Sequence, residues 1–136
     1  MEGRTSLMGE AKVTAGWLNM WTRRVPKLTI VKSNHDEALE RYIDEGRWKD
    51  DPENLYDACL LVRKRIDGVD PLKYLITEMA QVKRPDQIHW LDRDEDYIIY
   101  GIENGAHGDK GGNGSRGSLR GIEKAYYKAT VGHSHT

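Results

Sequence analysis

The stretch LTIVKSNHD at residues 28–36 joins a short run of strand-forming residues to a polar loop. Leucine, threonine, isoleucine and valine fill four of the five positions at 28–32, a composition that favours a β-strand. The chain then passes directly into a loop that contains Asn34, His35 and Asp36. Because ligands of α/β sheets bind in the loops at the ends of strands, this loop is a candidate binding site.

Three more histidines stand in the same position relative to a predicted strand. Residues 102–105 and 127–131 favour short strands, and His107 follows the first of them, while His133 and His135 follow the second. Imidazole is the commonest transition-metal ligand in proteins. Each signal is weak alone, since Asn-His-Asp is ordinary helix-capping composition and a terminal His-x-His is more often a tail than a ligand. Together they predict loops that bring ligands to one site.

The composition indicates an intracellular protein with one modest core. The chain has 136 residues and a formal net charge of −1, so the overall charge points to neither nucleic acid nor acidic lipid. The single cysteine, Cys59, excludes an internal disulfide framework and fits a reducing compartment. No apolar run approaches the roughly 20 residues that cross a bilayer, and the N-terminus lacks the apolar core of a signal peptide. We therefore expect a cytoplasmic location, in the host if the protein is phage-encoded, and no membrane partner.

Four helices are expected before Pro85, from apolar spacings of three and four residues. They span residues 9–24, 36–45 and 51–68, with a fourth that starts at Asp70 and Pro71. The third helix is expected to start in the same way, at Asp51 and Pro52. The predicted inner faces hold, in chain order, Val13, Trp17, Met20 and Trp21; Leu39, Tyr42 and Ile43; Leu55, Ala58, Cys59, Val62 and Ile66; and Leu72, Leu75, Ile76 and Met79.

After Pro85 the pattern changes to short strands, at residues 88–91 and 97–100 in addition to those above, and a short helix is expected at 118–125. The acidic run at 92–96 is interpreted as a solvated turn.

The glycine-rich loop at residues 107–118 is a candidate phosphate-binding segment. Gly112 and Gly114 allow backbone N–H groups to approach an anion closely, and Arg116 offers a fork of donors to a phosphate. The alternative is an ordinary surface loop with a solvated arginine.

The order of these motifs resembles the second half of the calcineurin-like metallophosphoesterase signature. That superfamily carries D-x-H, G-D-x-x-D, G-N-H-[DE], an isolated histidine and G-H-x-H, and the last three correspond here to residues 33–36, His107 and residues 132–135. The glycine-rich loop resembles a branch common among phage-encoded members, some of which are linked to DNA degradation. The resemblance covers about residues 10–136.

The resemblance implies a partial four-layer α/β/β/α sandwich, of the α/β (α+β) class, with a helical excursion at about residues 36–85 in one incomplete domain at 1–136. It also implies two divalent metal ions, with manganese favoured and iron or zinc as alternatives. Asn34, His107 and His133 would ligate the second metal, and His135 would reach the first.

The implied reaction is hydrolysis of a phosphate ester, most simply a phosphodiester such as DNA or another nucleotide ester. In the family a metal-bound hydroxide attacks phosphorus, while two metals stabilise the attacking and leaving oxygens. His35 would protonate the leaving oxygen, held in position by Asp36. Arg116, Gly112 and Gly114 would contact the substrate phosphate.

The chain departs from the family pattern at its front. Ser33 stands in place of the glycine of G-N-H-[DE], and residues 1–34 contain neither D-x-H nor G-D-x-x-D. We therefore expect a fragment truncated at both ends, which binds metal weakly at the second site and is inactive alone. Two alternatives stay open: a degenerate, non-catalytic binding module on the same fold, and a phosphomonoesterase acting on proteins or nucleotides.

Overall fold

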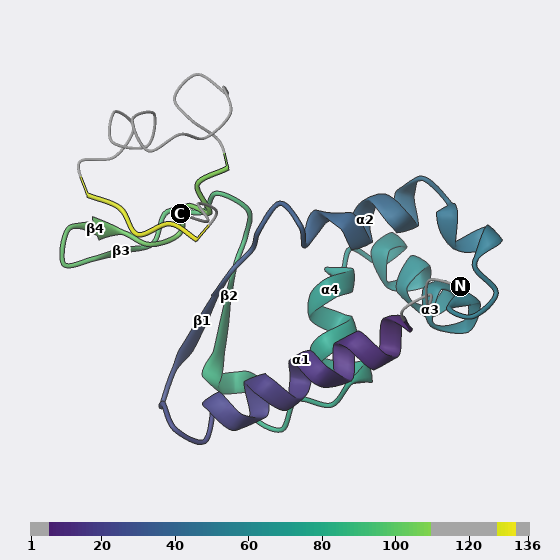
Figure 1. Ribbon diagram of the computed structural model, residues 1–136, viewed down its shortest axis with the longest axis horizontal. Helices are drawn as coiled ribbons and strands as arrows, with labels where there is room; N and C mark the ends of the chain where they lie inside the picture. The colour runs from purple at the N-terminus through teal and green to yellow at the C-terminus, as the bar shows by residue number, and fades with distance from the viewer. Residues whose placement is uncertain (1–5, 110–127, 133–136) are drawn as a thin grey trace, which may run out of the picture. The chain divides into compact units, whose positions relative to one another are not determined.

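The computed structural model describes residues 6–109 and 128–132, which form a mixed α+β protein (Figure 1). This confirms the predicted class. The described residues belong to two compact units. The helical unit comprises residues up to Leu28 together with residues 36–89, and the strand unit comprises residues 29–35 and those from Trp90 onward. Among the described residues, no helix combines the length and apolar character that crossing a membrane requires.

Helix α1 (Leu7–Trp21) begins at Ser6, whose side chain accepts a hydrogen bond from the backbone N–H of Gly9 at 3.2 Å. Its buried face consists of Ala11, Ala15 and Leu18, at spacings of four and three residues. Small alanines allow close approach to the neighbouring helices, so this face packs into the core.

The predicted inner face of α1 was wrong. Val13 is 63% exposed, Trp17 is 59% exposed and Trp21 is 46% exposed. Spacings of three and four occur on both sides of this helix, and the bulkier set faces away from the core. Arg24 covers the ring of Trp21 at 5.9 Å, within the range of a cation–π interaction.

The core of the helical unit is a cluster of Ala11, Ile43, Leu61 and Leu75. The cluster draws one residue from each of four helical elements. These are α1, α2 (Glu37–Asp44), α3 (Leu55–Ile66) and the helical segment formed by α4 (Pro71–Tyr74) and the π-helical η2 (Leu75–Met79). The predicted face of α2 is confirmed, because Leu39 and Tyr42 pack against the same cluster.

Helix α3 starts later than predicted, at Leu55 rather than after Asp51. The Asp51 carboxylate is engaged elsewhere: its Oδ2 accepts hydrogen bonds from the Tyr42 hydroxyl at 3.0 Å and from the Asn54 side chain at 2.9 Å. Burial, the hydrogen bond to Asp51 and the charge of Asp51 raise the pKa of Tyr42 to about 12. The tyrosine therefore remains a neutral donor at neutral pH, and Asp51 joins two segments instead of capping a helix.

The predicted inner face of α3 was also wrong in part. Ala58 and Leu61 are its buried residues, whereas Ile66 and the free thiol of Cys59 are exposed. Cys59 is thus not the small core residue that its position in the predicted stripe suggested.

The start signal at Asp70 and Pro71 is confirmed. The Asp70 side chain accepts from the backbone N–H of Lys73 at 3.0 Å, and Pro71 occupies the first helical turn. Two short 3-10 helices, η1 (Arg47–Asp50) and η3 (Pro85–Gln87), connect the larger elements.

Strands β1 (Leu28–Val31) and β2 (Ile88–Leu91) pair in a two-stranded sheet. Both strands were predicted, β2 with the bounds observed. The boundary between the helical unit and the strand unit falls within each of these two strands.

A hairpin of β3 (Ile98–Ile99) and β4 (Ile102–Glu103) forms the second sheet. Its antiparallel register aligns Ile99 with Ile102. The turn residues Tyr100 and Gly101 have φ of 51° and 77°, the positive values that a tight hairpin turn requires. Both predicted strands therefore exist, but each is shorter than the sequence indicated.

Segment 128–132 lies beside β4 in parallel orientation, through a bridge between Glu103 and Ala129. The backbone N–H of Glu103 donates to the Lys128 carbonyl at 2.9 Å, and the Thr130 N–H donates to the Glu103 carbonyl at 2.8 Å. The predicted last strand thus pairs with the strand that precedes His107.

Replacing Leu61 by alanine tests the core of the helical unit. Leu61 is fully buried, so Leu61→Ala is expected to lower the free energy of unfolding by about 2–5 kcal/mol. Its neighbour Leu60 is 40% exposed, and Leu60→Ala should cost only about 0.5 kcal/mol. Urea unfolding followed by circular dichroism measures both. Equal costs for the two variants would show that the buried face of α3 is assigned incorrectly.

Candidate functional site

The structure describes four of the residues predicted to form the site. Asn34 and His35 follow β1 in the strand unit, Asp36 is the N-cap residue of α2, and His107 follows β4. The remaining predicted site residues lie outside the described residues; these are Gly112, Gly114, Arg116, His133 and His135.

His107 lies beside the start of the G-H-S-H motif. The backbone N–H of Gly132 donates to the His107 carbonyl at 3.2 Å, further along the two segments that pair at Glu103 and Ala129. Parallel pairing sends the two segments in the same direction, so His107 and Gly132 lie at the same end of the pair. His107 and Gly132, the first residue of the last motif, are thus adjacent in space, although about 25 residues separate them in the sequence.

Gly108 makes this close approach possible. Its φ is +94°, in the region that favours glycine, and a Cβ atom placed there would lie 2.8 Å from the Cβ of Val131. Glycine is therefore required at position 108, because any larger residue would meet the neighbouring segment at Val131.

Asn34 has an uncommitted side-chain oxygen. Its Oδ1 is buried and has no hydrogen-bond partner among the described residues. A buried carbonyl oxygen without a partner costs free energy unless another group satisfies it, and an amide oxygen is a suitable ligand for a divalent cation. His35, the next residue, is exposed. The Asn34 oxygen is therefore buried, as expected of a metal ligand, whereas His35 is accessible, as expected of a group that faces the substrate.

Arg93 joins the two loops that carry Asn34 and His107. Its Nη1 donates to the carbonyl of Lys32 at 3.5 Å, and its Nη2 pairs with Oδ2 of Asp109. The Arg93 and Asp109 side chains are only 13% and 15% exposed. Arg93 was missed at the level of sequence because it lies in the acidic run interpreted as a solvated turn.

Asp109 is held in its charged form by this contact. Burial alone would raise the pKa of its carboxyl group, but the hydrogen bond from Arg93 and the Arg93 charge outweigh burial. Its own backbone N–H and the nearby His107 act in the same direction as Arg93. The pKa of Asp109 therefore lies below its ordinary value, and the group is a carboxylate at neutral pH.

The described residues supply part of a metal-binding set. Within residues 6–109 and 128–132, no group of three or more histidine, cysteine, aspartate or glutamate side chains is placed to hold a metal ion. Two of the four predicted ligands, Asn34 and His107, belong to that part of the chain, and His133 directly follows Gly132. An uncommitted amide oxygen and an imidazole are donors that a hydrolytic divalent metal accepts, so the donor chemistry fits.

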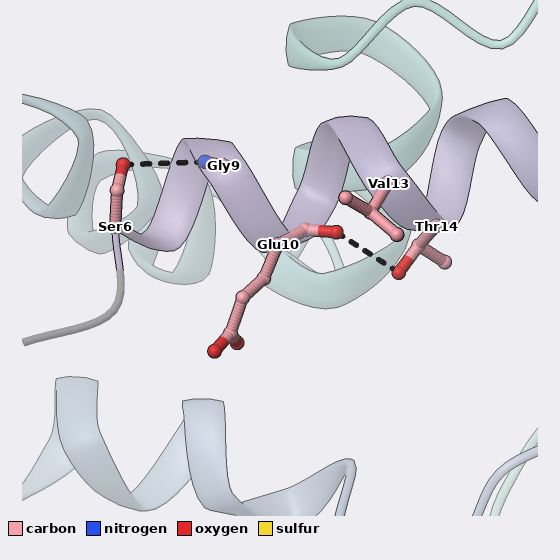
Figure 2. A pocket seen from close by; sticks show the side chains of 5 residues that line it. All are labelled: Ser6, Gly9, Glu10, Val13 and Thr14. Carbon is pink, nitrogen blue, oxygen red and sulfur yellow. Dashed lines mark hydrogen bonds between the residues drawn. The ribbon is translucent and has the colours of Figure 1, made fainter. Parts of the chain in front are cut away.

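A separate hollow lies along α1, lined by Ser6, Gly9, Glu10, Val13 and Thr14 (Figure 2). It is formed by consecutive turns of one helix. Figure 2 shows that Thr14 Oγ1 donates to the Glu10 carbonyl, at 3.1 Å. The hollow contains none of the predicted site residues.

The amino-acid sequence of the chain can be compared with the sequences of known proteins. The chain is 34% identical to Protein A1 of Escherichia phage T5 over an alignment of 143 positions, which covers 98% of this chain and 25% of Protein A1. A phage protein is therefore a relative, and the chain spans about a quarter of its length. No protein-family model matches the chain. No solved structure matches it significantly.

Substituting Gly108 tests the contact that aligns His107 with Gly132. Gly108→Ala is expected to destabilise the strand unit by about 1–3 kcal/mol, because a methyl group would meet Val131 and the φ is unfavourable for alanine. Hydrogen exchange at the Gly132 amide measures the effect, since that N–H bonds to His107. Gly132→Ala is the matched control, because a Cβ at Gly132 meets no atom within 4 Å among the described residues. Unchanged protection in Gly108→Ala would contradict the close approach.

Proposed function

We propose that this chain is part of a dinuclear metal-dependent phosphoesterase, and that the complete enzyme hydrolyses phosphodiesters such as DNA. One observation carries the proposal: segment 128–132 pairs in parallel with the strand before His107, so that the Gly132 N–H bonds to the His107 carbonyl. This pairing supports the proposal, because a shared metal site would need the isolated histidine and the G-H-x-H motif to lie close together. The relationship to a phage protein agrees with the phage-type branch.

In this proposal Asn34, His107 and His133 hold one metal ion, and His135 contributes to the other. The ions, when bound, supply the positive charge that stabilises the phosphate transition state and lowers the pKa of the attacking water. Manganese is the favoured metal, with iron and zinc as alternatives. Neutral imidazole and amide ligands leave more positive charge on a metal than carboxylates do, which suits an anionic substrate.

His35 is the proposed general acid. It is exposed, so a substrate can reach it, and it directly follows the proposed ligand Asn34. Its role is to protonate the leaving oxygen, and the neighbouring Asp36 is proposed to hold it in position. Arg116, Gly112 and Gly114 are the proposed contacts to the substrate phosphate.

The finer fold that we propose is a partial four-layer α/β/β/α sandwich. The hairpin of β3 and β4, extended by segment 128–132, would belong to one of its sheets. Ile98, Ile99 and Tyr100 are exposed on this hairpin, an apolar surface that a further layer would cover. The chain alone would then bind metal weakly and lack turnover, because the carboxylate blocks of the signature do not occur in it.

Metal binding by the 136-residue chain tests the proposed ligands. Wild-type protein should take up Mn²⁺, measured as loss of the electron paramagnetic resonance signal of free Mn²⁺. His107→Ala should weaken uptake at least tenfold, because it removes a ligand. His89, which lies within β2, provides the control, and His89→Ala should leave uptake unchanged. Absence of uptake by the wild type, or equal losses in both variants, would contradict the proposed site.

Substituting His35 tests the catalytic role in the full product of the reading frame that encodes these residues. His35→Ala is expected to lower kcat on bis(p-nitrophenyl) phosphate and DNA by about 10²-fold or more, while bound manganese stays constant. Metal content and turnover are measured on the same samples, with His89→Ala as the control. A parallel assay with p-nitrophenyl phosphate distinguishes diester from monoester specificity. If the wild type has no phosphoesterase activity and His35→Ala alters partner binding instead, the binding-module alternative is favoured.

A further inference from the structure

Arg93 contacts two separate loops through two different nitrogens. Nη1 reaches the carbonyl of Lys32, two residues before Asn34, and Nη2 reaches the carboxylate of Asp109, two residues after His107. All five residues belong to the strand unit. One side chain therefore connects the backbone that leads into the first predicted motif with the loop that follows the second.

These contacts differ from an ordinary surface ion pair. The Arg93 and Asp109 side chains are 13% and 15% exposed, so water screens their attraction weakly. Asp94 also lies near the guanidinium, at 3.6 Å from Nη1, and its side chain is 39% exposed. A guanidinium has a rigid, planar fork of donors, so it can fix the separation of two acceptors; the single ammonium of lysine cannot do this in the same way.

We propose that Arg93 is a positioning residue for the candidate metal centre: it fixes the loop of Asn34 relative to the loop of His107. This inference rests on the proposed function. Arg93 would act through the backbone of Lys32 and the carboxylate of Asp109. Partners of this kind orient metal ligands, and their loss commonly weakens metal affinity by about 10–100-fold.

The geometry explains why positioning is needed here. Asn34 and His107 come from strands of two different sheets, β1 and β4. The described backbone pairing fixes His107 relative to Gly132, but the pairing of β1 is with β2. The Arg93 contacts supply a direct connection between the two ligand-bearing loops.

The test compares Arg93→Lys and Arg93→Gln with Arg84→Lys in the full 136-residue chain. Arg84 is a matched control, because its Nη1 also donates to a backbone carbonyl, that of Thr22 at 3.2 Å, but in the helical unit. The probe is Mn²⁺ alone, titrated by electron paramagnetic resonance. A second readout uses metal-free protein: the nuclear magnetic resonance signals of the Asn34 side-chain amide and the His107 ring. Circular dichroism verifies that each variant is folded.

We expect Arg93→Lys to keep the charge and the fold, to shift the Asn34 and His107 signals, and to weaken Mn²⁺ binding at least tenfold. Arg84→Lys should match the wild type in both readouts. Should Arg93→Gln fail to fold, Arg93→Lys decides the question. Wild-type signals and affinity in Arg93→Lys, or equal changes in Arg84→Lys, would overturn the inference while the proposed function stands. Absence of Mn²⁺ uptake by the wild type would instead overturn the proposed function, and the metal-free signals would still decide whether Arg93 positions the two loops.

Discussion

The arrangement of the strand unit depends on the buried residue Glu103. Its Oε1 accepts hydrogen bonds from the backbone N–H groups of Tyr97 and Gly105, at 3.0 and 2.5 Å, and these two donors offset the cost of burying the side chain. Its own backbone pairs with Lys128 and Thr130. Glu103 therefore connects the β3–β4 hairpin, the backbone at Gly105 and the parallel segment 128–132. The position of His107 relative to Gly132 follows from these contacts.

Much of the element order could be predicted from the sequence, because local signals and tertiary structure agree there. The runs that became β1 and β2 are rich in β-branched or aromatic residues, and Asp70 caps its helix with its own side chain. The faces of α1 and α3 could not be predicted in the same way. Several apolar residues occur on both sides of each helix, and only packing against the other helices decides which set is buried. Asp51 shows a second limit, since a good capping residue was engaged by Tyr42 instead.

The structure places Gly132, the first residue of the G-H-S-H motif, beside His107, and it adds residues that the sequence analysis did not single out. The sequence displays two strand-forming runs that are each followed by histidine, whereas their parallel pairing is seen only in the structure. Arg93 and Glu103 were not found, because each lies among charged or exposed neighbours and looks like a surface residue. Long-range contacts of single charged side chains leave no local pattern. Only the three-dimensional arrangement shows that Arg93 reaches both Lys32 and Asp109.

The bridge between Glu103 and Ala129 also has a consequence for the order of folding. It closes a loop of about 25 residues, whose entropic cost must be met before the contacts within it form. Helices α1 to α4 form largely from near neighbours in the chain, which is the faster process. We therefore expect the helical unit to acquire its structure early and the parallel pair to form late. The same pairing should open first on heating, so the segment that places Gly132 beside His107 would also be among the least protected parts of the native protein.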